Sequence, residues 1–224
     1  MKTLRSRLAR PGTPSSAEAL PRTYERIAPF YDALDLPFEL GRYRRIRPLL
    51  FHGLSGRILD AGVGTGRNIA SYPPGSQVYG VDRSAAMLER AARRSRKSNV
   101  EVVLLRMDLA DLDFPDGTFD AAAASFVFCT MPPDMRHSAL RSLARVVKSG
   151  GTVRLLEYAP ARTAFRRMVA RAWQPWAAWA FGANLSHDIE PELAAASLRV
   201  TSSRYVASSI KLIEAVTDFP GERG

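Results

Sequence analysis

The stretch that most constrains this chain runs from Arg57 to Asn68 and reads R-I-L-D-A-G-V-G-T-G-R-N. The apolar pair I-L is suited to the end of a buried strand, and Asp60 follows where that strand would end. Three alternating glycines come next: Gly62, Gly64 and Gly66. Because glycine tolerates positive φ and has no Cβ, these positions predict a tight turn on which a ligand can lie directly against the backbone.

The spacing of this turn narrows the choice of ligand. A dinucleotide fingerprint needs a small residue at the sixth position, but counting from Gly62 that position is Arg67. An acid just before the first glycine also repels phosphate, yet it suits a ligand with an ammonium group. Asp60 therefore favours a ligand such as S-adenosylmethionine over a pyrophosphate, and Asn68 closes the motif.

Further polar residues follow the ends of later predicted strands. Gln77 to Asp82 should form the second strand, and Asp82 lies 20 residues beyond Gly62, where a carboxylate can accept hydrogen bonds from ribose hydroxyls. A third strand is expected over Val100 to Arg106, a fourth ends in the run from Ala121 to Ser125, and a fifth runs from Thr152 to Tyr158. Ligand sites in doubly wound folds lie outside the carboxyl ends of such strands. A short helix over Ile189 to Ala196 is expected after a capping Asp188. This alternation of strands and helices indicates one α/β domain with a mainly parallel sheet.

The segments D-A-G-V-G-T-G-R-N and V-Y-G-V-D-R-S-A-A-M-L resemble motifs I and II of the class I S-adenosylmethionine-dependent methyltransferases. The resemblance implies a Rossmann-like sheet that is mostly parallel and ends in an antiparallel hairpin, here Leu198 to Val206 and Ser209 to Val216. It also implies S-adenosyl-L-methionine as cofactor. The expected cofactor contacts are Asp60, Gly62, Gly64, Gly66, Asn68, Asp82, Arg83, Met87, Asp108, Leu109, Ser125 and Phe126. Ser84 should also cap the helix that follows the second strand.

Length and charge suggest how the chain is organised. With 224 residues we expect a mobile basic arm over residues 1–22, a single methyltransferase domain over 23–217 and a tail over 218–224. The net charge of +10 implies an anionic partner, either nucleic acid or an anionic membrane. No apolar run is long enough for a membrane span. The single Cys129 and three scattered histidines predict no disulfide and no metal site, which fits a cytoplasmic enzyme.

Residues 160–183 form an insertion rich in arginine and tryptophan, and they contain all three tryptophans of the chain. Tryptophan prefers the water–lipid boundary and arginine pairs with lipid phosphate, so this segment is expected to lie at a membrane surface. A lid whose aromatic side chains cover the active site is the alternative. Six residues are the candidates for contact with substrate or membrane: Arg167, Trp173, Trp176, Trp179, Arg204 and Lys211.

The segments F-V-F-C-T-M-P and W-Q-P-W-A-A-W-A-F-G-A resemble those of bacterial phosphatidylethanolamine N-methyltransferases. This resemblance implies stepwise N-methylation of phosphatidylethanolamine toward phosphatidylcholine, by a cytoplasmic protein peripherally associated with the inner membrane face. C-methylation of a quinone or polyprenyl phenol is the alternative. A nucleic-acid methyltransferase is disfavoured because the chain lacks the N/D-P-P-Y tetrad, so no nucleic-acid partner is expected.

The reaction also needs a group that handles a proton. A primary amine is mostly protonated at neutral pH, so a nearby acceptor must take a proton before the amine attacks. The candidates are Tyr24, Tyr31, Glu157, Tyr158 and His187. The two N-terminal tyrosines belong to Y-E-R-I-A-P-F-Y-D-A-L, which resembles a helix that caps the cofactor in methyltransferases acting on lipids and quinones.

Overall fold

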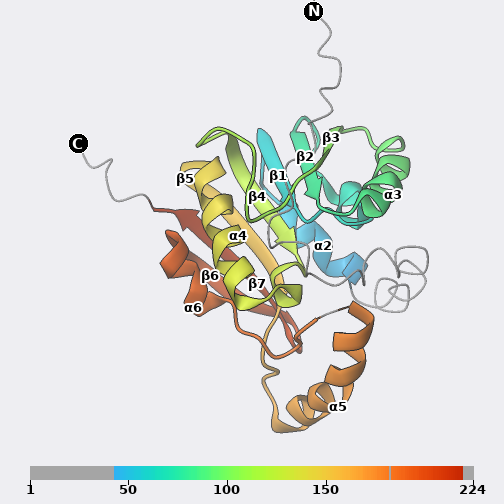
Figure 1. The fold of residues 1–224 in the computed structure, drawn as a ribbon, viewed down its shortest axis with the longest axis vertical. Helices are drawn as coiled ribbons and strands as arrows, with labels where there is room; N and C mark the ends of the chain where they lie inside the picture. The colour runs from blue at the N-terminus through green and yellow to red at the C-terminus, as the bar shows by residue number, and fades with distance from the viewer. Residues whose placement is uncertain (1–42, 182, 219–224) are drawn as a thin grey trace, which may run out of the picture.

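A seven-stranded sheet with helices on both faces forms the body of the computed structural model (Figure 1). The structure describes residues 43–181 and 183–218. The predicted basic arm, Tyr24, Tyr31 and most of the predicted tail lie outside these residues. The strands are β1 (Arg57–Ala61), β2 (Gln77–Asp82), β3 (Glu101–Arg106), β4 (Phe119–Ser125), β5 (Val147–Tyr158), β6 (Leu198–Ala207) and β7 (Ile210–Thr217). The α-helices are α2 (Arg44–Phe51), α3 (Ala85–Ser95), α4 (Pro133–Val146), α5 (Ala164–Phe181) and α6 (Glu190–Leu193).

The strand order β3-β2-β1-β4-β5-β7-β6 confirms the fold predicted from the sequence. Strands β1 to β5 pair in parallel, whereas β7 pairs antiparallel with β5 and β6 pairs antiparallel with β7. Reversal of strand order at β1 and β4 brings the carboxyl ends of β2, β1 and β4 side by side. This edge is where a doubly wound fold holds its ligand.

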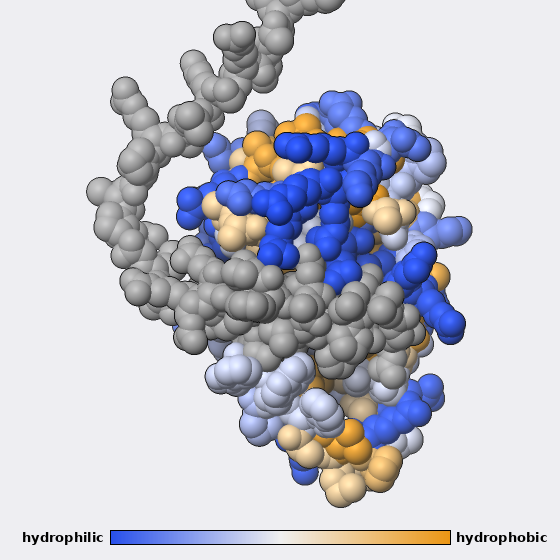
Figure 2. Space-filling model, turned by 90° about the vertical axis from the view of Figure 1, so that its right-hand side faces the viewer, coloured by the Kyte–Doolittle hydropathy of each residue, from blue (hydrophilic) through white to orange (hydrophobic). Residues whose placement is uncertain are grey.

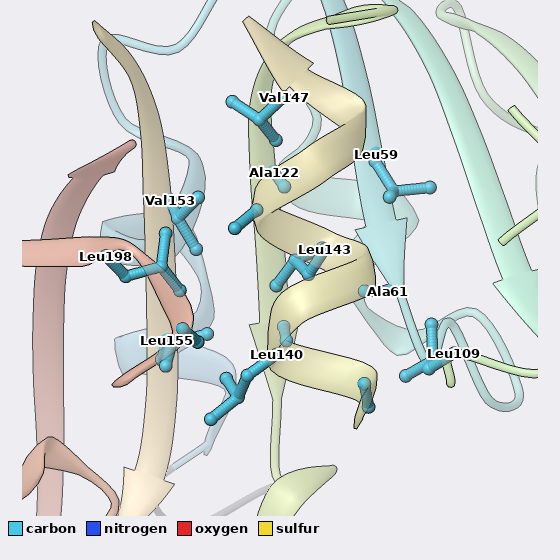
Figure 3. Packing of buried hydrophobic residues seen from close by; sticks show 14 of the residues in the cluster. Leu59, Ala61, Leu109, Ala122, Leu140, Leu143, Val147, Val153, Leu155 and Leu198 are labelled. Carbon is cyan, nitrogen blue, oxygen red and sulfur yellow. The ribbon is translucent and has the colours of Figure 1, made fainter. Parts of the chain in front are cut away.

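Side chains of the central strands point alternately to the two faces of the sheet, and helices cover both faces. Leu59, Ala122 and Leu155 point to one face, where they pack with Leu140 and Leu143 of α4 (Figure 3). The neighbouring residues of the same strands point to the other face and pack against α2, α3 and the 3-10 helix η3 (Arg67–Ser71). Both faces are therefore apolar, as expected for parallel strands covered by helices on each side.

Two local details differ from the predictions. Strand β5 begins at Val147 rather than Thr152, because its first residues bulge: Phe119 pairs with Val147, but Ala121 pairs with Thr152. The predicted cap of the last short helix is also wrong. Ile189 is the N-cap of α6, while the Asp188 carboxylate accepts a hydrogen bond from the Glu190 N–H at 3.3 Å.

The Arg/Trp-rich insertion folds largely as α5, which follows β5 and lies at the lower end of the molecule in Figure 1. Among residues 43–181 and 183–218, no helix has both the length and the apolar character to cross a membrane.

Candidate functional site

The glycine turn after β1 is held by the neighbouring strand β2. The Gly62 and Val63 N–H groups both donate to the Val81 carbonyl at 2.9 Å, and the Gly64 N–H donates to Asp82 Oδ2 at 3.0 Å. Gly64 has φ +53°, and a Cβ placed there would meet nothing nearer than the Gly62 carbonyl at 4.0 Å. The turn therefore leaves open backbone at the cavity, which is the room that the predicted cofactor requires.

Asp82 joins the turn to the start of α3. Its second carboxylate oxygen accepts the Ser84 N–H at 2.9 Å, and the Ser84 hydroxyl accepts the Met87 N–H at 3.3 Å, which confirms Ser84 as the helix cap. Burial raises the pKa of Asp82, although the hydrogen bonds from Ser84 and Gly64 oppose it. Asp82 is thus a fixed acceptor at the tip of β2.

Asp60 lies behind the cavity rather than in its lining, which corrects the expectation that its carboxylate meets the cofactor ammonium directly. The side chain is fully buried and accepts hydrogen bonds from Tyr72 Oη at 2.5 Å and from Asn68 Nδ2 at 3.2 Å. Burial raises the pKa of Asp60 to about 6, against these hydrogen bonds and the nearby Arg47. Asp60 therefore reaches the site through Asn68.

Arg47 of α2 is a site residue that the sequence patterns did not single out. The residue is 7% exposed and lines the cavity, and its guanidinium donates to Asn68 Oδ1 at 2.8 Å and to Ser125 Oγ at 3.2 Å. Tyr43, Ile46 and Leu50 share the buried face of the same segment. The sequence pattern that could have identified Arg47 is its position on the same helical face as these apolar residues. The neighbouring exposed arginines Arg44 and Arg45 made it look like part of a solvated basic face.

The cavity extends from the glycine turn to α5, and aromatic side chains form much of its wall. These are Tyr43, Phe126, Tyr158, Trp173 and Trp176. The Phe126 ring packs in a tilted arrangement against both tyrosines, with ring centroids 4.7 Å from Tyr43 and 5.2 Å from Tyr158, and the tyrosine hydroxyls are hydrogen-bonded to each other. Phe126 holds a left-handed φ of +56°, a strained conformation that turns the chain sharply after β4. Arg47 and Arg67 are the cations of the wall, and none of its described residues is acidic.

Comparison with known proteins agrees with this geometry. A family model described as "Methyltransferase domain" matches residues 58–151. A phosphatidylethanolamine N-methyltransferase of Cereibacter sphaeroides is 35% identical over 63% of this chain and 68% of that protein. The chain belongs to the class I S-adenosylmethionine-dependent methyltransferases.

Other similar proteins act on different molecules or show the fold alone. A demethylmenaquinone methyltransferase of Thermus thermophilus is also 35% identical, over 61% of this chain and 64% of that protein, so the chain spans less than two thirds of it. A methyltransferase solved in complex with the Trm112 activator of Haloferax volcanii superposes with a TM-score of 0.68. It is 17% identical, with 88% of this chain and 98% of the other covered. The methyltransferase therefore uses S-adenosyl-L-methionine, while its acceptor is a separate question.

The structure sorts the predicted cofactor contacts of this methyltransferase into two groups. Gly62, Gly64, Ser125 and Phe126 line the cavity, whereas Gly66 and Asn68 of the same motif do not. Asp82 and Asp108 lie at the ends of the adjacent strands β2 and β3, outside the cavity wall, and Asp108 Oδ1 accepts the Ala110 N–H at 3.0 Å. Three further predicted contacts are also absent from the wall: Arg83, Met87 and Leu109. The Leu109 side chain is buried in the hydrophobic core, so its contact with the cofactor stays a prediction.

Of the described candidates for proton handling, only Tyr158 lines the cavity. Glu157 is wrong for this role, because it is buried and its carboxylate accepts the N–H groups of Val127, Phe128 and Cys129 at 2.7, 2.9 and 3.2 Å. Burial raises its pKa, so it holds the loop after β4 in place. His187 is also outside the cavity wall: its Nε2 lies 2.9 Å from Glu192 Oε1, beside α6.

The predicted substrate and membrane residues do not form one cluster. Trp173 and Trp176 line the cavity, whereas Trp179 is 74% exposed. Lys211 is wrong as a phosphate contact, because its ammonium is paired with the carboxylates of Asp188 and Glu190. Two arginines are likewise away from the cavity wall: Arg167, which donates to the Ala161 carbonyl at 3.1 Å, and the exposed Arg204 of β6.

Proposed function

We propose that this methyltransferase transfers methyl groups from S-adenosyl-L-methionine to the amine of phosphatidylethanolamine, stepwise toward phosphatidylcholine. One observation carries the proposal: the cavity wall combines five aromatic rings with two arginines and has no acid among its described residues. A zwitterionic headgroup has an anionic phosphodiester beside a cationic amine. Arg67 suits the first and an aromatic face suits the second, so the wall offers partners for both ends of the headgroup while Arg47 remains for the cofactor.

The aromatic rings would also favour the product over bulk water. Each added methyl group leaves a larger, more weakly hydrated cation, and cation–π attraction to tyrosine or tryptophan requires no hydrogen-bond donor on that cation. A carboxylate in the wall would bind the ammonium form of the substrate and keep it protonated. Its absence from the described wall is therefore consistent with an amine that must attack as the free base.

The cofactor, when bound, supplies an electrophilic methyl group on a sulfonium. The chain itself must align the reactants, exclude water and accept hydrogen bonds from the amine. We assign the cofactor carboxylate to Arg47, whose guanidinium is already oriented by Asn68 and Ser125. Phe126, Trp173 and Trp176 close the wall against water. The linked hydroxyls of Tyr43 and Tyr158 are the polar pair that can accept hydrogen bonds from the amine.

The reaction is proposed to take place at the cytoplasmic face of the inner membrane, with the enzyme as a peripheral protein. The net charge of +10 supports this placement, because anionic lipids attract basic proteins over long range. Ring C-methylation of a quinone is the second candidate. Relatives that act on quinone precursors are equally similar in sequence, and the same stacked rings could hold a flat quinone ring.

Labelling separates the two candidates. The purified full chain is incubated with methyl-labelled cofactor and with vesicles containing phosphatidylethanolamine and demethylmenaquinone together, and the lipids are resolved by thin-layer chromatography. We expect label in the mono-, di- and trimethylated phospholipids. Label confined to the quinone would reject the proposal.

A substitution at the tyrosine pair tests the assigned role of its hydroxyl. Tyr158→Phe keeps the ring that stacks on Phe126 but removes the hydroxyl that bonds Tyr43. We expect kcat to fall while the Kd of the cofactor stays the same. An unchanged kcat would exclude this hydroxyl from the reaction.

A further inference from the structure

Helix α5 presents its apolar residues to solvent. Among the described residues, every exposed large hydrophobic side chain belongs to this helix: Phe165, Met168, Val169, Trp173 and Trp179, with exposed fractions of 69, 60, 40, 54 and 74%. Figure 2 shows apolar atoms gathered, with hydrophilic atoms beside them, at the lower end of the molecule where Figure 1 places α5. Scattered single hydrophobics need no explanation, but a contiguous group on one helix indicates a contact surface.

Apart from Trp176, which lines the cavity, the less exposed residues of α5 over 164–179 are small or polar, the reverse of an ordinary surface helix. Gln174 Nε2 donates to the Ala183 carbonyl at 2.8 Å, Gln174 Oε1 accepts the Leu185 N–H at 2.9 Å, and Ala177 is buried. With about 100° between successive residues, Phe165 lies on the side of the helix opposite Gln174. The bonds of Gln174 therefore hold the apolar face outward.

The surroundings of this face are basic. Between Glu157 and Asp188 the chain contains four arginines and no acid. The arginines Arg166 and Arg171 are exposed on α5 itself. A protein partner of average surface would not require this combination, whereas arginine beside tryptophan and aliphatic side chains matches the phosphates and the acyl boundary of an anionic bilayer.

Two tryptophans connect this face with the cavity. Trp173 and Trp176 pack edge to face with ring centroids 5.6 Å apart, and both line the cavity, while Trp173 is also half exposed. A headgroup at the bilayer surface would thus meet the cavity wall along the edge of the docked helix. This removes the need to extract the whole lipid into water.

We propose that the outer face of α5 is the membrane-docking surface of this enzyme and that an anionic lipid bilayer is its partner. The inference rests on the proposed action on a membrane lipid and identifies the element that makes the contact. Phe165, Met168 and Trp179 would lie among the headgroups and upper acyl chains, with Arg166 and Arg171 on lipid phosphates.

Intrinsic fluorescence tests this directly, because all three tryptophans of the protein lie on α5. The full chain is titrated at low salt with vesicles of equal parts phosphatidylglycerol and phosphatidylcholine, without cofactor. We expect a blue shift of tryptophan emission and quenching by lipids brominated near the headgroup. Absence of both changes would overturn docking through α5. It would not contradict the proposed reaction, because this experiment measures no turnover.

Two variants and a matched control sharpen the test. Phe165→Ser with Met168→Ser, away from the cavity wall, should abolish the shift, and Arg166→Glu with Arg171→Glu should weaken vesicle binding at least about tenfold. Arg96→Glu with Lys97→Glu makes the same charge change at the end of α3, on exposed residues, and should weaken binding less. Equal effects of the two charge reversals would overturn the proposal in favour of general electrostatic attraction.

If something other than a bilayer covers the outer face of α5, light scattering and acrylamide quenching will show it. If a second copy covers it, light scattering will show a dimer that Phe165→Ser with Met168→Ser converts to a monomer. If another part of the same chain covers it, acrylamide will fail to quench Trp173 and Trp179 in the lipid-free protein. Either result would overturn the proposal, whereas a monomer with quenchable tryptophans supports it.

Discussion

Asp60, Asn68 and Arg47 form a line of hydrogen bonds from the buried end of β1 to the cavity. Asp60 orients Asn68, and Asn68 orients Arg47. At the buried end of this line, Tyr72 donates a hydrogen bond to Asp60. A buried arginine is costly unless its charge and donors are satisfied, and this line provides that compensation. At the scale of single residues, the site is therefore a network in which the acid orients the amide and the amide orients the guanidinium.

Arg47→Lys should weaken cofactor binding. Lysine keeps the positive charge but loses the planar fork that can bind Asn68, Ser125 and a carboxylate together. We expect the Kd of S-adenosyl-L-methionine to rise roughly tenfold, which corresponds to about 1.4 kcal/mol, as measured by calorimetry. Arg45→Lys on the exposed side of the same helix is the control and should bind normally. Equal affinities for the two variants would remove Arg47 from the cofactor site.

The buried Asp60 should make stability depend on pH. Its folded pKa of about 6 lies above the ordinary 3.8, so the folded protein holds a proton that the unfolded chain has released in this window. The stabilising contribution is fully present below pH 3.8 and is lost as pH rises through about 6. The full loss is about 3 kcal/mol.

Urea unfolding of the wild type and of Asp60→Asn across this window measures the effect. The wild type should lose stability relative to the variant as the pH rises, because asparagine carries no titrating proton. Asp113→Asn, at an exposed position, is the control and should run parallel to the wild type. Parallel curves for Asp60→Asn as well would show that Asp60 does not titrate in this range.

At the scale of elements, the turn between β1 and η3 depends on close contact with α3. A Cβ at Gly66 would lie 2.7 Å from Ile69 Cδ1 and 2.9 Å from the Ala91 backbone, with φ at +81°. The loop after β4 is fixed differently, by three N–H groups that converge on Glu157. The cavity is thus framed by one turn held through packing and one loop held through a buried carboxylate.

Gly66→Ala should destabilise the protein by about 3 kcal/mol, through backbone strain and the clash with Ala91. Gly75 has a similar φ of +78°, but a Cβ added there would meet no atom within 4 Å. Gly75→Ala should therefore cost only the strain, about 1 kcal/mol. Chemical denaturation measures the free energy of unfolding of the two variants and so separates the cost of packing from the cost of strain. Equal losses of stability would mean that the contact between Gly66 and α3 adjusts to the added Cβ without cost.

At the scale of the whole molecule, the basic charge and the apolar face of α5 should act at different ranges. The charge of +10 attracts anionic lipid over a distance that salt shortens, whereas apolar contact is not screened by salt. Placement of α5 at one end of the molecule, beyond the sheet, leaves both features accessible to a flat surface (Figure 1).

Salt should therefore weaken vesicle binding but leave cofactor binding unchanged. When sodium chloride rises from about 0.05 to 0.5 M, the Debye length falls severalfold, and we expect affinity for anionic vesicles to drop by at least about tenfold. Flotation of vesicles measures this loss, with neutral phosphatidylcholine vesicles as the control. Salt-independent flotation would show that charge has no part in docking.

Much of the fold and part of the site could be predicted from local patterns. Asp82 and Ser84 were found because each stands at a strand end or a helix start that local signals predict, even though the Gly64 partner of Asp82 is 18 residues away. Arg47 was missed because the arginines beside it obscured its local signal, and its partners Asn68 and Ser125 are 21 and 78 residues away. His187 and Lys211 were chosen as chemically capable groups, but each is paired with acids around α6 that no local pattern revealed.

Turn geometry, hydrophobic alternation and composition are local or additive properties, so the amino-acid sequence is enough to predict the α/β class, the cofactor and the charge of this protein. Which polar groups reach the cavity depends instead on three-dimensional packing. Asp60 and Glu157 are buried away from the cavity, whereas Arg47 and Tyr43 line it, because the direction of a side chain depends on what packs against it. The same applies to α5. Its sequence is that of an amphipathic helix, but its apolar face points outward because Gln174 is hydrogen-bonded to Ala183 and Leu185.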